Sequence, residues 1–218
     1  MTVNITELSS PQIDSWITPA RLAPYLDVAG AENISMAARL YVWNARLASA
    51  CMETIHHVEV LVRNAIHRRL AGSEPADGLR SWLVDPDVLK PGELHAVGAA
   101  ITRIRRVGKV ATTHRVISGL PLSFWVRLTG TAYEELWKAS LHHAFPHSSG
   151  LRRDVAGPLN RVSQLRNDIA HHHPLLDVPV ADRHRDLLDL AAAIDPAAAA
   201  WIGALSRLEE VLAAIPAA

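Results

Sequence analysis

Residues 33–70 read NISMAARLYVWNARLASACMETIHHVEVLVRNAIHRRL, and this stretch contains neither proline nor glycine. These two residue types weaken a helix interior more than any others. Alanine, leucine, arginine and other helix-forming residues recur along it, and Ala71-Gly72 closes it. The stretch therefore predicts a helical fold. It forms either one long helix or two helices separated somewhere between residues 49 and 54.

Shorter helices are expected on both sides of this stretch. Before it, Ser10-Pro11 and Thr18-Pro19 are typical of a capping residue followed by proline at the first helical position, and they predict two short helices within residues 11–29. After it, the prolines and glycines of residues 72–91 predict a loop. The rest of the chain predicts helices at 92–107, 112–118, 121–129, 131–145, 151–172, 181–194 and 197–214.

The composition agrees with a globular helical protein. Hydrophobic residues make up 49% of the 218 residues and charged residues 20%, which excludes a disordered chain. Aromatic residues make up only 5%, whereas strands draw on aromatic and β-branched side chains. We therefore expect an all-α protein of a single domain, in which short helices of residues 1–30 pack on a helical core formed by residues 31–218.

Charge and cysteine content limit the partners and the compartment. Lys plus Arg and Asp plus Glu both number 22, so any affinity for nucleic acid must come from local patches. Cys51 is the single cysteine, which excludes an internal disulfide and a cysteine-based zinc site and suits a reducing compartment. We find no signal-peptide pattern and no apolar run of roughly 18 residues. We expect a cytoplasmic protein without a membrane partner.

The segment 164–174 reads QLRNDIAHHHP and lies at the end of the helix predicted for residues 151–172. At about 100° per residue, Arg166 falls inside the apolar stripe that includes Leu159, Val162 and Ile169. An unpaired charge is expensive to bury. Arg166 must therefore be paired, face a cleft or face a second subunit.

The other side of this helix carries a row of neutral hydrogen-bonding side chains, namely Asn160, Gln164, Asn167 and His171. Such a row is typical of a polar cleft or a polar interface. The spacing does not decide which histidine partners Arg166: an ideal helix puts His173 nearest to it, but Pro174 disfavours helical angles at His173. For His172 and His173 the alternative role is to cap the end of the helix.

A second group of ionisable residues lies on one side of the long predicted helix, among apolar neighbours: His56, Glu59, Arg63 and His67. We hypothesise that Glu59 and Arg63 pack against Arg166 and orient it. The alternative is a structural ion pair that holds two helices in register.

The densest basic patch lies at the end of the helix predicted at 92–107 and just past it, and includes Arg103, Arg105, Arg106 and Lys109. It suggests contact with RNA phosphates, because Arg and Lys bind phosphate without sequence preference; a solvated helix end is the alternative. Asp168 and His172 stand at i and i+4 and could ligate a metal together, but no HExxH motif, phosphate-binding loop or G-x-S-x-G elbow occurs. We expect no metal and no cofactor.

Three motifs resemble a known family. The run R-N-x-x-x-H-H that starts at Arg166, together with EVLVRN at 59–64 and SFWVRL at 123–128, resembles the Abi-like (abortive infection) family of the HEPN superfamily over most of residues 35–175. The resemblance implies a HEPN-like bundle with long antiparallel helices and a homodimer whose active site combines both subunits. It also implies phage defence or a toxin–antitoxin role, with an antitoxin as a possible partner.

The same resemblance assigns the candidate site. It picks Arg166 and His171 as catalytic residues and Asn167 as the residue that positions the phosphate or the histidine. Supporting residues would be Glu59, Arg63, Asn64, Gln164 and His172. An acidic residue often occupies the position of His173 in this family, so the chain departs from the pattern there.

The expected activity is a metal-independent endoribonuclease. The 2′-hydroxyl of RNA is the nucleophile, a histidine moves the proton, and an arginine holds the charge of the phosphorane. The products are a 2′,3′-cyclic phosphate and a 5′-hydroxyl. The alternative is a HEPN-type helical module that dimerises, or that binds RNA or a protein partner, without cleaving anything.

Overall fold

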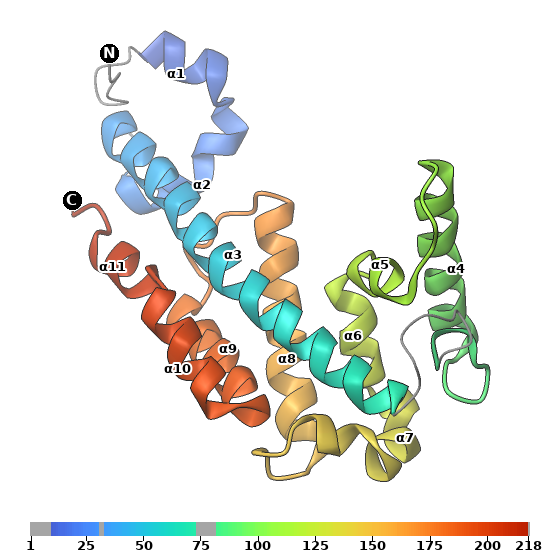
Figure 1. Cartoon of the computed structure of the whole chain (residues 1–218). Coiled ribbons are helices and arrows are strands. Elements are labelled where there is room, and N and C mark those ends of the chain that lie inside the picture. The colour runs from blue at the N-terminus through green and yellow to red at the C-terminus, as the bar shows by residue number, and fades with distance from the viewer. Residues whose placement is uncertain (1–9, 31–32, 73–81, 218) are drawn as a thin grey trace.

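The computed structural model describes residues 10–30, 33–72 and 82–217. Every element in these ranges is helical and none is a strand, which confirms the all-α prediction. Figure 1 shows α3 (Ile34–Ala71) running through the length of the molecule, with the other helices arranged along it. Within the same ranges no helix combines the length and the hydropathy needed to cross a membrane.

The long helix α3 is continuous over 38 residues, so the unbroken alternative is correct. Asn33 caps its start, where Oδ1 accepts a hydrogen bond from the amide of Met36 at 3.1 Å. Gly72, with φ of 58°, follows its end. Buried residues line α3 throughout, and Cys51 and Thr54 are among them within residues 49–54, the stretch of the alternative break. Packing of this central stretch into the core keeps the helix continuous through residues 49–54.

The C-terminal helices form the main core with α3. α9 (Val180–Ile194) packs against α3, α8 (Arg152–Ala170) and α10 (Pro196–Leu205). An ion-pair network joins α8 to α9: Arg161 Nε and Nη2 donate to Asp186 at 2.8 and 2.6 Å, and Arg183 Nη1 donates to it at 3.2 Å. Burial alone would raise the pKa of Asp186, but its hydrogen bonds to and the positive charges of these arginines hold that pKa below its usual value.

The helix predicted at 197–214 is interrupted, so that prediction is wrong. α10 ends at Leu205 and α11 (Leu208–Ala213) begins three residues later. Two residues of the break contact α3 instead of continuing the helix: Ser206 Oγ lies 3.2 Å from Thr54 Oγ1, and Arg207 Nη2 donates to Glu53 at 2.8 Å. These long-range contacts override the local helix propensity.

The helix predicted at 131–145 is also wrong. The chain forms three short pieces there, η3 (Thr131–Tyr133), α7 (Glu134–Ala139) and η4 (Leu141–Ala144). Ser140 leaves helical geometry at φ −148°, and its carbonyl accepts a hydrogen bond from Arg69 Nε of α3 at 3.1 Å. The break lets Trp137 and Phe145 stack with ring centroids 5.7 Å apart in the core.

The N-terminal helix α2 (Pro19–Ala29) packs on the first turns of α3, and α1 (Ser10–Trp16) precedes it. Ile13, Leu22 and Tyr25 form a second hydrophobic cluster there with Met36 and Leu40 of α3. Partly buried Leu176, from the segment after α8, packs against this cluster. The N-terminal helices therefore lie close to the chain that follows the candidate histidines.

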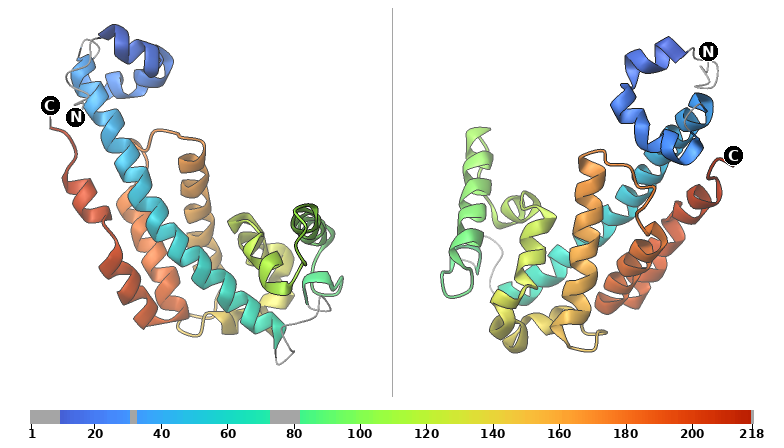
Figure 2. Two further views of the ribbon diagram at one scale, coloured as in Figure 1. Left: turned by 45° about the horizontal axis from the view of Figure 1, so that its top comes forward. Right: turned by 180° about the vertical axis from the view of Figure 1, so that it is seen from behind.

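At the other end of α3 lie η2 (Trp82–Val84), α4 (Pro91–Arg106), α5 (Thr113–Ser118) and α6 (Leu122–Leu128). Figure 2 shows α4 at the edge of the molecule, on the far side of α5 and α6 from α8. Buried Glu93 holds the start of α4, since it accepts hydrogen bonds from Tyr133 Oη at 2.7 Å and from Arg127 Nε at 2.5 Å. The basic end of α4 is consequently remote from the end of α8.

Candidate functional site

The end of α8 has a defined turn in which all three histidines take part. The helix ends at Ala170 instead of the predicted His172, because His172 adopts φ of 58° and reverses the chain. The amide of His172 donates to the carbonyl of Ile169 at 3.0 Å, and the amide of His173 donates to the carbonyl of Asp168 at 2.8 Å. This pair of hydrogen bonds is the Schellman motif, which usually has glycine at the left-handed position. Here a histidine occupies it.

The turn gives the three imidazoles different neighbours, although all three residues are exposed. His173 Nδ1 lies 3.2 Å from Asp168 Oδ1, and the ring centroids of His171 and His173 lie 5.9 Å apart. The backbone carbonyl of His172 accepts a hydrogen bond from the guanidinium of Arg21 in α2. His171, His173 and Asp168 therefore form one surface cluster, which we call the histidine cluster.

Arg166 lies on a different side of α8 from His171. Five residues separate the two, which corresponds to roughly 140° around a helix. Gln164, Asn167 and His171 are exposed, whereas Arg166 is half-buried on the side of α8 that faces α3. The fold thus puts Asn167 and His171 on the same exposed side and turns Arg166 inward.

Glu59 of α3 lies near Arg166. Burial of its carboxyl group raises the pKa of Glu59 above the usual value, and the opposing charges of Arg166, Arg63 and His56 offset only part of that effect. No ion pair within 4.0 Å joins Glu59 to either arginine in the described part of the chain. Nε of Arg63 is buried and has no hydrogen-bond partner within that part. These residues are electrostatically coupled across α3 and α8 without forming a closed ion pair.

Two other polar residues of α3, Asn64 and His67, have separate surroundings. Asn64 is half-buried on α3. His67 is structural, because its Nδ1 lies 3.1 Å from Trp82 Nε1, which donates to it, and burial lowers its pKa. His67 thus ties η2 to the end of α3 and does not extend the polar site.

The basic residues of α4 form an open surface. Arg103, Arg105, Arg106 and Lys109 are all exposed, and Arg103 Nη1 donates to the carbonyl of Gly119 at 3.3 Å. A shallow hollow of about 470 Å³ lies beside Arg103 and Arg106 and is also lined by His95 and Thr102. Because α4 stands apart from α8, this surface and the histidine cluster would have to contact different parts of one RNA (Figure 1).

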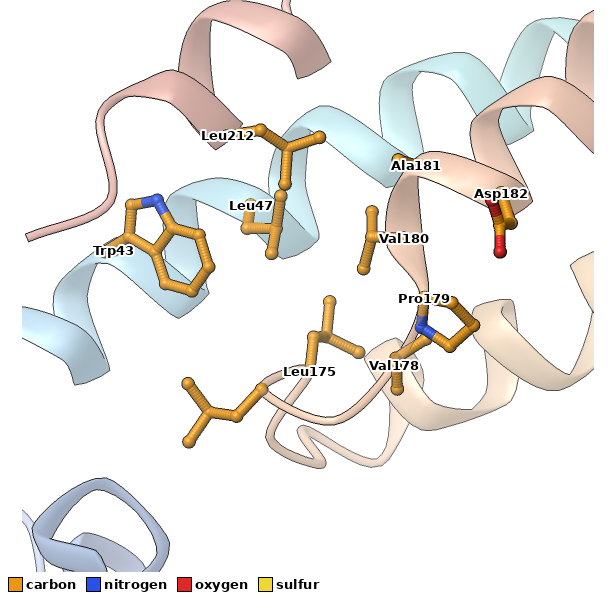
Figure 3. A pocket seen from close by; sticks show the side chains of 10 residues that line it. Trp43, Leu47, Leu175, Val178, Pro179, Val180, Ala181, Asp182 and Leu212 are labelled. Carbon is orange, nitrogen blue, oxygen red and sulfur yellow. The ribbon is translucent and has the colours of Figure 1, made fainter. Parts of the chain in front are cut away.

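A pocket of about 260 Å³ lies between α3, α9, α11 and the segment before α9. Figure 3 shows its wall, formed by Trp43, Leu47, Leu175, Val180 and Leu212. The charged side chain on its rim, Asp182, is engaged by Arg185 Nη2 at 2.6 Å. With no converging polar groups among its lining residues, the pocket has no evident chemistry. The described residues also contain no group of three His, Cys, Asp or Glu side chains suited to a metal ion.

No family model matches this chain, and no curated protein or solved structure is significantly similar to it. Its function must therefore be argued from its own residues.

The sequence pattern missed two contacts of this region, the pairing of Asp168 with His173 and the hydrogen bond from Arg21 to His172. The pairing of Asp168 with His173 spans five residues and needs the left-handed turn at His172, which an ideal helix does not contain. Arg21 is 151 positions away from His172 in the chain. The one signal for the turn was Pro174, which disfavours helical angles at the residue before it.

Proposed function

We propose that this chain is a metal-independent endoribonuclease that cleaves RNA through attack of the 2′-hydroxyl on the adjacent phosphodiester. The observation that supports it is the exposed end of α8, where two imidazoles and the amide of Asn167 stand on an open surface. Imidazole exchanges protons near neutral pH, which this reaction requires at both reacting oxygens. RNA brings its own nucleophile, so the protein needs only proton transfer, phosphate binding and a cation.

The chain carries candidate cations for the phosphate in two places. The exposed residues Arg103, Arg105, Arg106 and Lys109 suit the RNA backbone at a distance from the cleaved bond. Arg166 suits the charge that develops on the phosphorane. Arg166 and His171 lie on different sides of α8 within one subunit. We therefore propose a homodimer whose active site combines both subunits, so that Arg166 is brought towards the reacting phosphate. Glu59, Arg63 and Asn64 would orient it, and Gln164 and His172 would support the neighbouring surface.

The biological role follows from the resemblance of the three motifs to the Abi-like family of the HEPN superfamily. We propose a HEPN-like bundle that acts in phage defence or as the toxin of a toxin–antitoxin pair. Toxicity on expression in a bacterial host, lost in Arg166→Ala or His171→Ala at equal protein levels, would support this role.

The test of the activity uses purified protein and total RNA in the presence of EDTA. Wild type should cleave the RNA and leave 2′,3′-cyclic phosphate ends, whereas Arg166→Ala and His171→Ala should leave it intact. Cleavage that is lost in EDTA and restored by a divalent ion would contradict the metal-independent mechanism. Far-UV circular dichroism of each variant controls for folding.

A second candidate function is a non-catalytic module that dimerises or binds RNA or a protein partner. The observation that favours it is the outward position of His171 and the inward position of Arg166, which are not assembled within one subunit. If RNA stays intact with all three proteins while wild type forms a stable dimer, this candidate replaces the nuclease.

A further inference from the structure

We propose that His173 is the general acid of the cleavage reaction, that His171 is its general base, and that Asp168 positions His173. This inference rests on the proposed function and assigns roles within the same site. It comes from the turn after α8, where the chain reversal at His172 returns the ring of His173 to Asp168. A pairing of Arg166 with one histidine gives no role to the contact between Asp168 and His173.

The contact between Asp168 and His173 defines the orientation of the ring. Nδ1 lies 3.2 Å from the carboxylate oxygen Oδ1. A carboxylate accepts hydrogen bonds, so Nδ1 carries the proton and Nε2 is the ring nitrogen left to react. A carboxylate in this position also holds the tautomer and stabilises an imidazolium. Nε2 of His173 is therefore the ring nitrogen placed to donate a proton to the leaving oxygen.

His171 complements it. The ring has no carboxylate partner in the described part of the chain, and its centroid lies 5.9 Å from that of His173 with 32° between the ring planes. The attacking and leaving oxygens of a phosphodiester lie on opposite sides of a single phosphorus atom. The acid and the base must consequently reach one phosphate from opposite sides, and two rings whose centroids lie 5.9 Å apart can both contact the same phosphate. Exposed Asn167, one turn earlier than His171, can donate to a phosphate oxygen.

The turn that creates the cluster is held from two sides. The Schellman hydrogen bonds close it on α8, and Arg21 of α2 donates to the carbonyl of His172. His172 occupies the left-handed region at φ 58°, which is unfavourable for a side chain other than glycine and is often retained where it serves a site. The strained residue here is the one whose conformation sets the distance between the two reacting imidazoles.

The proton transfers balance in a single step. His171 removes the proton of the 2′-hydroxyl, and the 2′-oxygen forms a bond to phosphorus. The bond from phosphorus to the 5′-oxygen breaks, and that oxygen takes the proton from His173 Nε2. The products are a 2′,3′-cyclic phosphate and a 5′-hydroxyl, and proton exchange with water restores both rings.

The test compares two leaving groups in one oligoribonucleotide. The first substrate is an oligomer that wild type cleaves at a mapped position. The second is the same oligomer with sulfur replacing the bridging 5′-oxygen at that position, so that a thiolate leaves without a proton. His173→Ala should lose about 10²- to 10⁴-fold in kcat on the oxygen substrate and stay within about tenfold of wild type on the sulfur substrate, as expected where the lost group is the acid. His171→Ala should be slow on both.

Asp168→Asn tests the positioning role with little change in shape. It should show the same selective loss on the oxygen substrate, smaller than that of His173→Ala. His147→Ala, an exposed histidine in the turn before α8, is the matched control and should behave as wild type. Equal losses on the two substrates in His173→Ala, or no loss on either, would overturn the assignment while the nuclease activity stands. If wild type cleaves no RNA from which such an oligomer could be mapped, the proposed function itself is refuted.

Discussion

Replacing Asp186 with asparagine tests whether the ion-pair network between α8 and α9 stabilises the fold. Asp186 is 8% exposed. Its carboxylate accepts hydrogen bonds at 2.8 and 2.6 Å from Arg161 and at 3.2 Å from Arg183. Removing one partner of a fully buried pair costs about 3–5 kcal/mol. The cost here should be about 2–3 kcal/mol, because the side chain of Arg161 is 41% exposed and water can hydrate it.

The pH dependence of this effect has a definite sign. The pKa of Asp186 in the folded protein is held below its usual value by Arg161 and Arg183, against the effect of burial. A carboxylate of this kind contributes its full stabilisation above the unfolded-state pKa and loses it as the pH falls through the folded-state pKa. The difference in unfolding free energy between wild type and Asp186→Asn should therefore be largest near neutral pH and should shrink in acid.

The assay is urea unfolding followed by far-UV circular dichroism at several pH values. Asp182→Asn on the same helix is the matched control. Asp182 pairs with Arg185, three residues later in the chain, at 2.6 Å, but the side chain of Asp182 is 55% exposed. An exposed pair contributes about 0–1 kcal/mol, so this variant should lose little. If Asp186→Asn loses no more than Asp182→Asn, or if its deficit is the same in acid, the reasoning is refuted.

Three further predictions concern single residues. His172→Gly should change the unfolding free energy by less than about 1 kcal/mol, because glycine adopts φ of 58° without strain but loses more chain entropy on folding. A large loss of stability in urea unfolding would contradict this. Tyr133→Phe should lower the unfolding free energy by about 1.5–3 kcal/mol, since it removes the 2.7 Å hydrogen bond to the buried carboxylate of Glu93; an unchanged melting temperature would count against it. Burial raises the pKa of the Cys51 thiol to about 12, so a thiol-specific chromogenic disulfide should label Cys51 only in denaturant. Rapid labelling of the folded protein would contradict this and would show that α3 opens.

Local signals in the sequence were sufficient for most helix ends. Thr18 with Pro19, Asn33 and Gly72 mark boundaries that the structure has at or next to those residues. Such signals act through backbone angles and nearby hydrogen bonds, which neighbouring residues determine. They failed at Ser140 and at Ser206, where Arg69 and Thr54 of α3 bind the chain at a break. Those contacts join residues far apart in the sequence, and no local pattern announces them.

The sequence by itself determined that the protein is helical, that residues 33–70 are helical in one piece or two, and that Arg166 lies within the apolar stripe of α8. Helical periodicity and the placement of proline and glycine carry that information, because they depend on residues a few positions apart. Only the tertiary structure decided that Arg166 lies near Glu59 of α3 and that the ring of His173 contacts the carboxylate of Asp168. Those positions depend on which helix packs against which face, and on a left-handed residue that Arg21 of α2 helps to hold.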